Sequence, residues 1–521
     1  MPTAAQLRNR VSDPNDGLAH FRSILPLTAI LVDFRWLLLP VALVAALAVS
    51  FALPAAGWSV MLGWILLPAI ASDRPFHSLS IVGPATFAAA ILFLKYGVGF
   101  ALLNSLDVPM NPETITYCGG FAFLILATLL LAMKVSGGWS QAAALIRGTL
   151  TKVEPELARV GLMLFGYTLL LTSVQVYTGS IDRSTATTKV ADFGQMGWWS
   201  WFEMFQDTTS LGIFLVPLVA RKLPPGGGWI CYGLASFRAI ACMLGGSRAL
   251  SIFSLAMLGL GFITFSPRRT KYLELKIILI AIAVWPTINF TSYLRNTKGF
   301  HGTKITNFDA RLSAAVDAAT TYQNEDLKAQ SESLLVTARA MLEFSDPLIY
   351  DNTPAPHPFD GFSDLGNLAY VFIPRYFFPS KPILLDGNEI VISYTGIRQT
   401  GTAATISLMA DLYRRAGVSG VVVGSILSAM ILVFYLKVSF FVMRRLDDVL
   451  GVVMILLLIT LGFRAPLFHW TVLATGSFYL YSIPKYLLFL GFLIALSRLV
   501  GQRKMPAMLP VQALDFRMVI H

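Results

Sequence analysis

Two cations stand six residues apart in YVFIPRYFFPSKP (370–382), a stretch that also holds five aromatic residues and three prolines. Arginine donates two parallel hydrogen bonds to phosphate, and proline keeps this segment from forming a helix. A stiff loop presents Arg375 and Lys381 without the entropy cost of ordering them when a ligand binds. The segment therefore predicts a loop that holds positive charge against an anionic group at an apolar surface. The alternative is an interfacial lid whose cations are solvated.

Further arginines fall at the ends of apolar stretches or in the long segment between them. They are Arg248 in GGSRALSIF, Arg295 in TSYLRNT, Arg339 and Arg398. A charge at the bilayer centre costs about 2.5–3.5 kcal/mol, and less at a span end. Together these cations predict an anionic ligand at the membrane surface. Taken singly, Arg248 and Arg295 also fit interfacial anchors, and Arg339 fits a salt bridge to Glu343.

Carboxylate and imidazole groups on the same outward side can accept a proton as general bases. The candidates are His301, His357, Asp360, Asp364, Glu389 and Asp411. Asp411, in LMADLYRR, is one of them. Its alternative role is an ion pair with Arg414 or Arg415, three and four residues further along a helix. His469 and Arg464 fit an acceptor groove or an interfacial cap.

The elements that position these residues are predicted to be membrane helices. Of the 521 residues, 55% are hydrophobic and 13% charged, against about 25% charged in soluble domains. The mean hydropathy is +0.65. Since a span needs about 20 apolar residues, the sequence predicts about twelve membrane spans. They lie near 36–54, 57–71, 79–104, 115–134, 158–178, 200–220, 229–246, 249–266, 277–293, 418–440, 449–463 and 473–496.

The net charge of +11 follows from topology, because cytoplasmic loops collect Lys and Arg. Lys152, Arg221, Lys222 and Arg444 fall on one side if the N-terminus is cytoplasmic, and no nucleic-acid partner is expected. The prediction divides the chain into a cytoplasmic segment (1–35), nine spans (36–293), a large outward loop (294–417), three spans (418–496) and a cytoplasmic tail (497–521).

The outward loop is predicted to be largely helical. Asn307 is placed to cap a first helix, which a turn at 324–326 separates from a second. Residues 351–367 are rich in Pro, Gly and Asp and predict irregular structure. Residues 394–417 predict a flexible stretch that leads into a helix docked against the bilayer.

Motifs of soluble enzymes do not occur in the sequence. There is no Walker loop, HExxH, paired CxxC or acidic DxD, so neither a metal site nor a cofactor is expected. The cysteines Cys118, Cys231 and Cys242 lie in apolar segments and predict no disulfide framework. The Asp447–Asp448 pair predicts an interfacial salt-bridge cluster with Arg444 and Arg445.

The chain resembles the bacterial O-antigen polymerases, or oligosaccharide repeat-unit polymerases. The resemblance covers roughly residues 200–440 and rests on SR at the head of a span (247–248), YLR (293–295, near the family's YxxR), IPRYFFPSKP (373–382) and LMADLYRRAGVSG (408–420). It implies a GT-C type glycosyltransferase of the bacterial inner membrane, inverting and metal-independent, with its active site on the periplasmic face.

The resemblance also implies the substrate and its ligands. A growing glycan moves from its lipid carrier onto a new undecaprenyl-diphosphate-linked oligosaccharide, within the membrane lipid, and a chain-length regulator protein is a possible partner. Arg248, Arg295, Arg339, Arg375 and Lys381 are then expected to bind the diphosphate, and Asp411, Arg375 and Arg248 to be catalytic.

Three alternative functions remain open. An O-antigen ligase would move the finished glycan onto a lipid A core sugar or a protein. A transporter or flippase would carry charged groups along a path at mid-membrane depth, where here Lys95 and Glu203 are the main ones. A non-catalytic scaffold is the third.

Overall fold

The chain is an all-α membrane protein. The computed structural model describes residues 92, 96, 111–135, 138–179, 181, 203–245, 248–265, 294, 308–324, 345–373, 390, 392–394, 406–462 and 471–502. Every regular element among them is a helix. Five helices are long and apolar enough to cross a membrane, by length and composition. They are Pro112–Ala132, Lys152–Tyr177, Gly226–Leu244, Leu408–Arg445 and Val472–Gly501.

Helices occupy eight of the stretches predicted as spans. In chain order they are α8 (Pro112–Val135), α9 (Gly138–Tyr177), α11 (Thr209–Lys222) after the short η4 (Gln206–Thr208), α12 (Pro225–Leu244), α13 (Arg248–Phe265), α20 (Leu408–Arg445), α21 (Asp448–Leu457) with η6 (Leu458–Gly462), and α22 (Val472–Ser477), η7 (Phe478–Ser482) and α23 (Ile483–Gln502). The predicted spans 36–54, 57–71 and 277–293, and 79–104 apart from Leu92 and Tyr96, lie outside the described residues. The count of twelve therefore stays a prediction.

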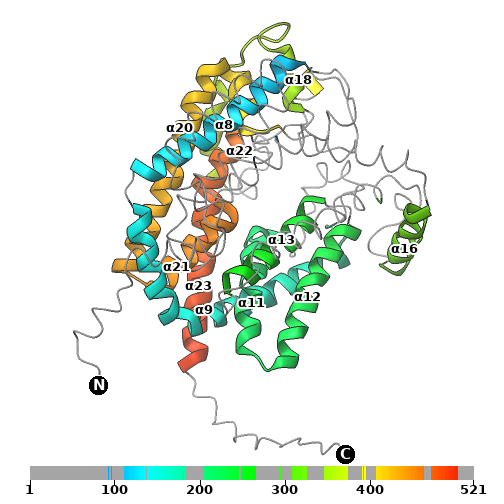
Figure 1. Cartoon of the computed structure of the whole chain (residues 1–521), viewed down its shortest axis with the longest axis vertical. Coiled ribbons are helices and arrows are strands. Elements are labelled where there is room, and N and C mark those ends of the chain that lie inside the picture. Colours follow the sequence, from blue (N-terminus) through cyan, green and yellow to red (C-terminus); the bar gives the residue numbers. More distant parts are fainter. Residues whose placement is uncertain are drawn as a thin grey trace, which may run out of the picture.

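Helix α11 is deeply enclosed. Every residue from Leu211 to Ala220 is buried, and the helix packs against α9, α12 and α13. Its 14 residues extend only about 21 Å at 1.5 Å per residue, less than the hydrocarbon core of a bilayer. The predicted span 200–220 is thus a short buried helix that η4 precedes. Figure 1 shows α11, α12 and α13 grouped on one side, with α8 running beside α20 on the other.

One glycine sets the close packing of α13 on α11. A Cβ atom at Gly261 would lie 2.0 Å from the carbonyl oxygen of Phe214. No side chain fits there without moving the α11 backbone, so the two helices approach through the glycine. The ring of Phe214 meets Phe265 edge-on beside this contact, with the ring centroids 5.5 Å apart.

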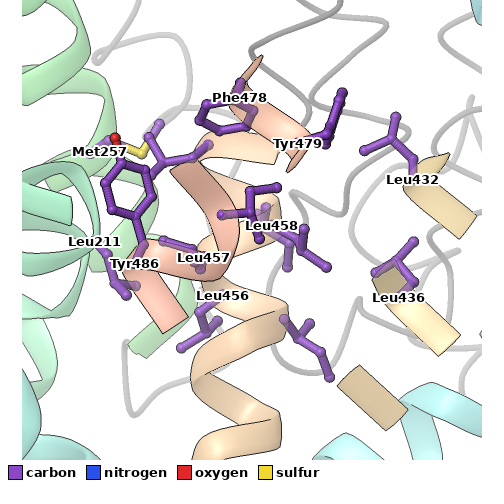
Figure 2. Close-up of a cluster of buried hydrophobic side chains, with 14 of the residues drawn as sticks. Leu211, Met257, Leu432, Leu436, Leu456, Leu457, Leu458, Phe478, Tyr479 and Tyr486 are labelled. Carbon is purple, nitrogen blue, oxygen red and sulfur yellow. The ribbon is translucent and has the colours of Figure 1, made fainter. Parts of the chain in front are cut away.

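A hydrophobic core joins the two groups of helices. Figure 2 shows Leu211 of α11 and Met257 of α13 close to Tyr486 of α23, and Leu457 of α21 beside them. The same cluster continues to Leu432 of α20. Because leucine, methionine and tyrosine side chains from five helices share this core, the described spans form one packed bundle.

An ion-pair belt marks one end of the bundle. It consists of Lys152, Glu154, Glu156, Arg221, Lys222, Asp447, Asp448 and Arg498. Asp447 pairs with Arg498 at 2.6 Å and Asp448 with Lys152 at 2.6 Å. The predicted cluster at Asp447–Asp448 is therefore present, with Arg498 and Lys152 as partners where Arg444 and Arg445 were expected.

The opposite end of the bundle, here called the rim, carries the described parts of the predicted loop. There α9 ends at Tyr177, α12 ends at Leu244 and α13 begins at Arg248. Helix α16 (Phe308–Asn324) starts directly after Asn307 and ends at the predicted turn. Residues 351–367 are more regular than predicted, because α18 (Ser345–Asn352) and the 3-10 helix η5 (Ser363–Phe372) both enter them. The predicted second loop helix, within 328–344, lies outside the described residues.

Helix α20 crosses from the rim to the ion-pair belt with one break. Ala416 and Gly417 leave helical geometry, and Gly417 has φ +62°, a conformation that favours glycine. The residues before the break, Leu408–Arg415, are all buried. The segment predicted to dock against the bilayer therefore packs inside the protein, since its charged residues find partners there.

Candidate functional site

The predicted diphosphate ligands lie mostly outside the described residues. Arg248 is the first residue of α13, and its backbone places it at the rim. Arg295, Arg339, Arg375 and Lys381 fall outside the described ranges, as does Arg398. Of the predicted catalytic residues, Asp411 alone has a described side chain.

Asp411 is a fully buried carboxylate at the start of α20. Its helix begins at an N-cap, where the Ser407 hydroxyl accepts a hydrogen bond from the Ala410 backbone N–H. Oδ1 of Asp411 accepts from Nε and Nη2 of Arg414 at 3.0 and 2.6 Å. Oδ2 accepts from Nε of Arg415 at 3.1 Å and from the backbone N–H of Val472 at 2.7 Å.

The two arginines extend this arrangement to the 357–364 segment. Arg414 pairs with Asp360, and Nη1 and Nη2 of Arg415 bind the two oxygens of Asp364, the second at 2.7 Å. Backbone bonds reinforce the contact, because the N–H groups of Asp360 and Gly361 donate to the carbonyls of Arg414 and Arg415. We call Asp360, Asp364, Asp411, Arg414 and Arg415 the carboxylate–arginine cluster.

This cluster joins three segments that are distant in the sequence. Three carboxylates meet two guanidinium groups, so every buried charge has a partner of opposite sign. Asp411 has 0% exposure, whereas the Asp360 and Asp364 side chains are 51% and 38% exposed. The cluster therefore neutralises charge at its buried side and meets solvent at its outer side.

The geometry of Asp411 matches the ion-pair role given as its alternative. Each of its oxygens already accepts two hydrogen bonds, and its side chain has no exposed surface. A carboxylate takes a proton from a hydroxyl only at an oxygen that the hydroxyl can reach. For Asp411 to act as a general base, one of its four donors would first have to leave.

The other proposed bases are distributed as follows. Asp360 and Asp364 are engaged by Arg414 and Arg415. The His357 ring lies against the Tyr394 ring, with centroids 4.3 Å apart, and the Tyr394 hydroxyl is hydrogen-bonded to Thr353 at 2.7 Å. His301, Glu389, Arg464 and His469 are outside the described residues.

A buried acid beside the cluster was not anticipated. Asp346 of α18 is fully buried, accepts from the Ser407 backbone N–H at 2.8 Å and accepts from the Tyr96 hydroxyl at 3.2 Å. Burial, together with the Asp346 charge, raises the pKa of the nearby Tyr350 phenol well above its ordinary value. Tyr350 therefore stays protonated at neutral pH. The residue types around Asp346 give no motif that sequence reasoning could use.

A hydrophobic cluster gathers several elements at the rim near Arg248. Leu294, the residue before Arg295, is fully buried with Leu244 of α12 and Ala315 of α16, and Leu250 of α13 packs against them. Arg311 of α16 has 0% exposure and donates from Nε to the Leu244 carbonyl at 2.9 Å. The chain next to Arg248 and the chain next to Arg295 thus meet beneath one loop helix.

Two buried arginines were missed by the sequence analysis. Arg311 lies in a stretch that resembles an ordinary amphipathic helix, so nothing in the sequence distinguishes it. Arg238 did carry a signal, because it is the only charged residue in the predicted span 229–246. A single ionisable residue within a span is a candidate functional residue, because placing its charge in the membrane costs free energy.

These features define the class of the protein: an all-α membrane protein whose rim holds buried, charge-rich contacts between its spans and a helical loop. No protein-family model, curated protein or solved structure matches the chain significantly.

Proposed function

We propose that the chain polymerises undecaprenyl-diphosphate-linked oligosaccharide repeat units into a surface polysaccharide, such as an O-antigen, capsule or exopolysaccharide. The rim faces the periplasm in this proposal, and the ion-pair belt faces the cytoplasm. The full plan is the twelve-span GT-C type of the bacterial inner membrane, with the loop 294–417 outside. The sequence motifs that resemble repeat-unit polymerases are the first support for it.

The observation that carries the proposal is the meeting of Leu244, Leu250 and Leu294 under α16. Leu250 follows Arg248 by two residues and Leu294 directly precedes Arg295 in the sequence, so the described residues next to two of the expected diphosphate ligands meet at the rim. A diphosphate carries several negative charges. Guanidinium groups bind it with paired, charge-assisted hydrogen bonds.

The proposed reaction is an inverting glycosyl transfer. A hydroxyl of the acceptor sugar attacks the anomeric carbon of the donor glycan, and the bond from that carbon to the diphosphate oxygen breaks. Negative charge develops on the departing lipid diphosphate, where Arg248, Arg295 and Arg375 stabilise it, with Arg339 and Lys381 further out. The hydroxyl proton passes to a base.

Asp411 has a positioning role in this proposal. Its carboxylate orients Arg414 and Arg415, which hold the 357–364 segment at the rim. The same loop continues into IPRYFFPSKP, so the carboxylate–arginine cluster fixes one end of the segment that carries Arg375 and Lys381. The base is then sought among His301, His357 and Glu389.

The test uses the purified chain in nanodiscs with lipid-linked repeat units isolated from the source membranes. We expect Arg375→Ala to abolish the ladder of extended products, with a loss of about 10²–10³ in rate. Arg375→Lys should also fail, because an ammonium cannot reproduce the two-pronged bond. The matched control is Arg444→Ala, which removes an exposed arginine at the belt end of α20.

The products distinguish the possible results. A full ladder from Arg375→Ala protein would show that Arg375 does not stabilise the leaving group. If wild-type protein left every lipid-linked unit unextended but, when supplied with a lipid-linked finished glycan and a core-sugar acceptor, joined the two, the chain would be a ligase. Gel filtration of each variant shows whether it remains folded.

A further inference from the structure

Lys485 is the only charged residue in the predicted span 473–496. It lies half-buried in α23, 13 residues before Arg498 of the ion-pair belt, which is about 20 Å along a helix. The hydrocarbon core of a bilayer is about 30 Å thick, so this lysine lies within the membrane and in its rim half. A charge at such a depth costs free energy, which makes Lys485 a candidate functional residue.

Three aromatic rings lie close to the Lys485 ammonium. Its Nζ atom is 4.8 Å from the centroid of the Tyr486 ring, 5.0 Å from that of Tyr481 and 6.0 Å from that of Phe205. Ring faces attract a cation but are weak hydrogen-bond acceptors. The rings therefore hold the ammonium in place and leave its N–H donors for a stronger acceptor. We call Lys485 and these three rings the lysine cage.

The rings of the lysine cage are themselves held by neighbouring groups. The Tyr486 hydroxyl donates to Oδ2 of Asp207 at 2.6 Å. The Phe205 ring stacks on the Phe489 ring of α23, with the centroids 4.4 Å apart. The cage is therefore ordered before a ligand binds, which lowers the entropy cost of binding. Asp207 also adds negative charge near Lys485, so a structural charge balance between the two is the alternative that the test must separate.

The loop segment that leads to Arg375 contacts the lysine cage. Helix η5 packs against α22, and at its end the Phe372 ring meets the Tyr481 ring edge-on, with the centroids 6.4 Å apart. Ile373, the next residue, begins IPRYFFPSKP and precedes Arg375 by two residues. Two residues span at most about 7 Å. The chain that carries the predicted phosphate-binding loop therefore starts at the lysine cage.

Gln175 of α9 joins the lysine cage to the part of the rim that holds the residues next to Arg248 and Arg295. Its Nε2 atom donates to Oε1 of Gln206 at 3.4 Å, and Gln206 directly follows Phe205 of the cage. The next residue of α9 packs against the hydrophobic cluster beneath α16. The lysine cage is thus connected by direct contacts to both the loop and this part of the rim.

We propose that Lys485 is a further anion-binding residue of the polymerisation site and takes the phosphate that is joined to the polyprenyl chain. The naming of this lipid rests on the proposed function. Lys485 lies about one helical turn nearer the belt than Tyr481, the cage residue that contacts the loop. A cation at that depth meets the phosphate joined to the lipid, whereas the rim arginines meet the phosphate joined to the sugar.

This placement gives Lys485 a defined part in the transfer. Negative charge develops on the lipid diphosphate as its bond to the anomeric carbon breaks. A fixed ammonium at the inner phosphate stabilises that charge as a point charge with N–H donors. Because its rings already hold it in position, the ammonium needs no rearrangement during the reaction.

The test measures lipid binding by native mass spectrometry of the full chain in phosphatidylcholine nanodiscs. Undecaprenyl diphosphate and undecaprenyl phosphate are the probes, since both carry the phosphate joined to the lipid, and phosphatidylglycerol and inorganic pyrophosphate are separate arms. We expect Lys485→Met to weaken the binding of both probes about tenfold or more, because charge-assisted hydrogen bonds disappear. Lys485→Arg should keep most of the affinity. Lys437→Met, which removes an exposed lysine from α20, is the matched control and should change neither.

A second readout separates binding from a structural charge balance. Without ligand, Lys485→Met should melt no lower than wild type, because the change removes a charge from the membrane and methionine packs against the same rings. A lysine that only balances Asp207 would behave differently. A lower melting temperature of Lys485→Met that Asp207→Asn restores, with unchanged lipid affinity, would overturn the inference.

Acetylation of amines in the wild-type protein, followed by peptide mass spectrometry, tests the same contact without a substitution. Undecaprenyl diphosphate should protect Lys485 and leave the reactivity of Lys437 unchanged. If saturating lipid gave Lys485 no protection, the inference would fail even where Lys485→Met did not fold.

The outcomes of the binding experiment distinguish the two proposals. Wild-type affinity in Lys485→Met would overturn the role of Lys485 and leave the proposed function standing. A loss for undecaprenyl diphosphate without one for undecaprenyl phosphate would overturn the assignment to the phosphate joined to the lipid. An equal loss for phosphatidylglycerol, or a loss for inorganic pyrophosphate alone, would overturn the polyprenyl lipid as the ligand. Binding of neither probe to wild-type protein would overturn both proposals.

Discussion

Asp411 accepts a 2.7 Å hydrogen bond from the backbone N–H of Val472, the first residue of α22. The two residues are 61 positions apart, so this bond ties the start of α20 to the start of another membrane segment. On the other side, Arg415 ties the same turn of α20 to Gly361 and Asp364. A single buried carboxylate thus lies where a span, a loop and a second span meet.

Asp411→Ala should destabilise the protein strongly. The change leaves Arg414, Arg415 and the Val472 N–H short of an acceptor in a buried place, and we expect the free energy of unfolding to fall by about 3 kcal/mol. Chemical denaturation in detergent measures it. The control is Asp309→Ala, which removes an exposed acid from α16. An equal, small effect of both substitutions would show that the cluster contributes little to stability.

Gly261→Ala should disrupt the packing of α13 on α11. The added methyl would overlap the Phe214 carbonyl, so the helices must separate and the buried contacts along α11 weaken. We expect a loss of about 1–3 kcal/mol in the free energy of unfolding, typical of overpacking. Gly233→Ala on α12 is the matched control, since nothing lies within 4 Å of its added Cβ. A neutral Gly261→Ala variant would contradict the close approach.

Arg311→Met should loosen α16 from the rim. The change keeps the apolar bulk but removes the bond to the Leu244 carbonyl, leaving that acceptor buried without its donor. We expect faster proteolysis within residues 294–417 and a smaller change in global melting temperature. Leu312→Met, an exposed position on the same helix, is the control. Equal cleavage rates in wild type and Arg311→Met would rule out this anchoring.

Acid should weaken the ion-pair belt through Asp447. Burial alone raises the pKa of this carboxyl, but the Arg498 guanidinium and the Leu450 backbone N–H outweigh burial and hold the pKa below its ordinary value. A pKa lowered by folding means that the carboxylate stabilises the fold above the unfolded value, about 3.9. This stabilisation is lost as the pH falls through the folded value.

The melting temperature of Asp447→Asn should therefore depend less on pH below about 5 than that of wild type. Glu156 also pairs with Arg498, so the substitution leaves that arginine one partner. Asp448→Asn is the control, because the Lys152 side chain that it loses is 75% exposed and such pairs contribute little. Identical acid dependence in wild type and Asp447→Asn would refute the argument.

Local patterns predicted the elements of the fold well. Apolar length predicted the spans that became α8, α9, α12 and α20, and Asn307 and the 324–326 turn predicted the limits of α16. The predicted start of a span at 418 coincides with the break at Ala416 and Gly417. Such features depend on neighbouring residues, so they can be read along the chain.

The contacts of the candidate site depend on segments that are remote in sequence. The spacing of Asp411, Arg414 and Arg415 indicated an ion pair, but not that Asp360, Asp364 and Val472 would complete it. Arg238 meets Thr172 and Gln175 because these two residues face it from α9. Packing between spans decides which groups meet inside a helical bundle. The periodicity of residues along a single helix does not encode these contacts.

The break in α20 has a mechanical consequence. The non-helical geometry of Ala416 and Gly417 separates the turn that contains Asp411 from the rest of α20, so the two parts need not share one helix axis. When a bilayer thins or thickens, a long span adjusts its tilt. The dipeptide Ala416–Gly417 can take up this change of tilt. The turn of α20 that holds Asp411 then keeps its contacts with the loop while the apolar part of the helix after Gly417 tilts.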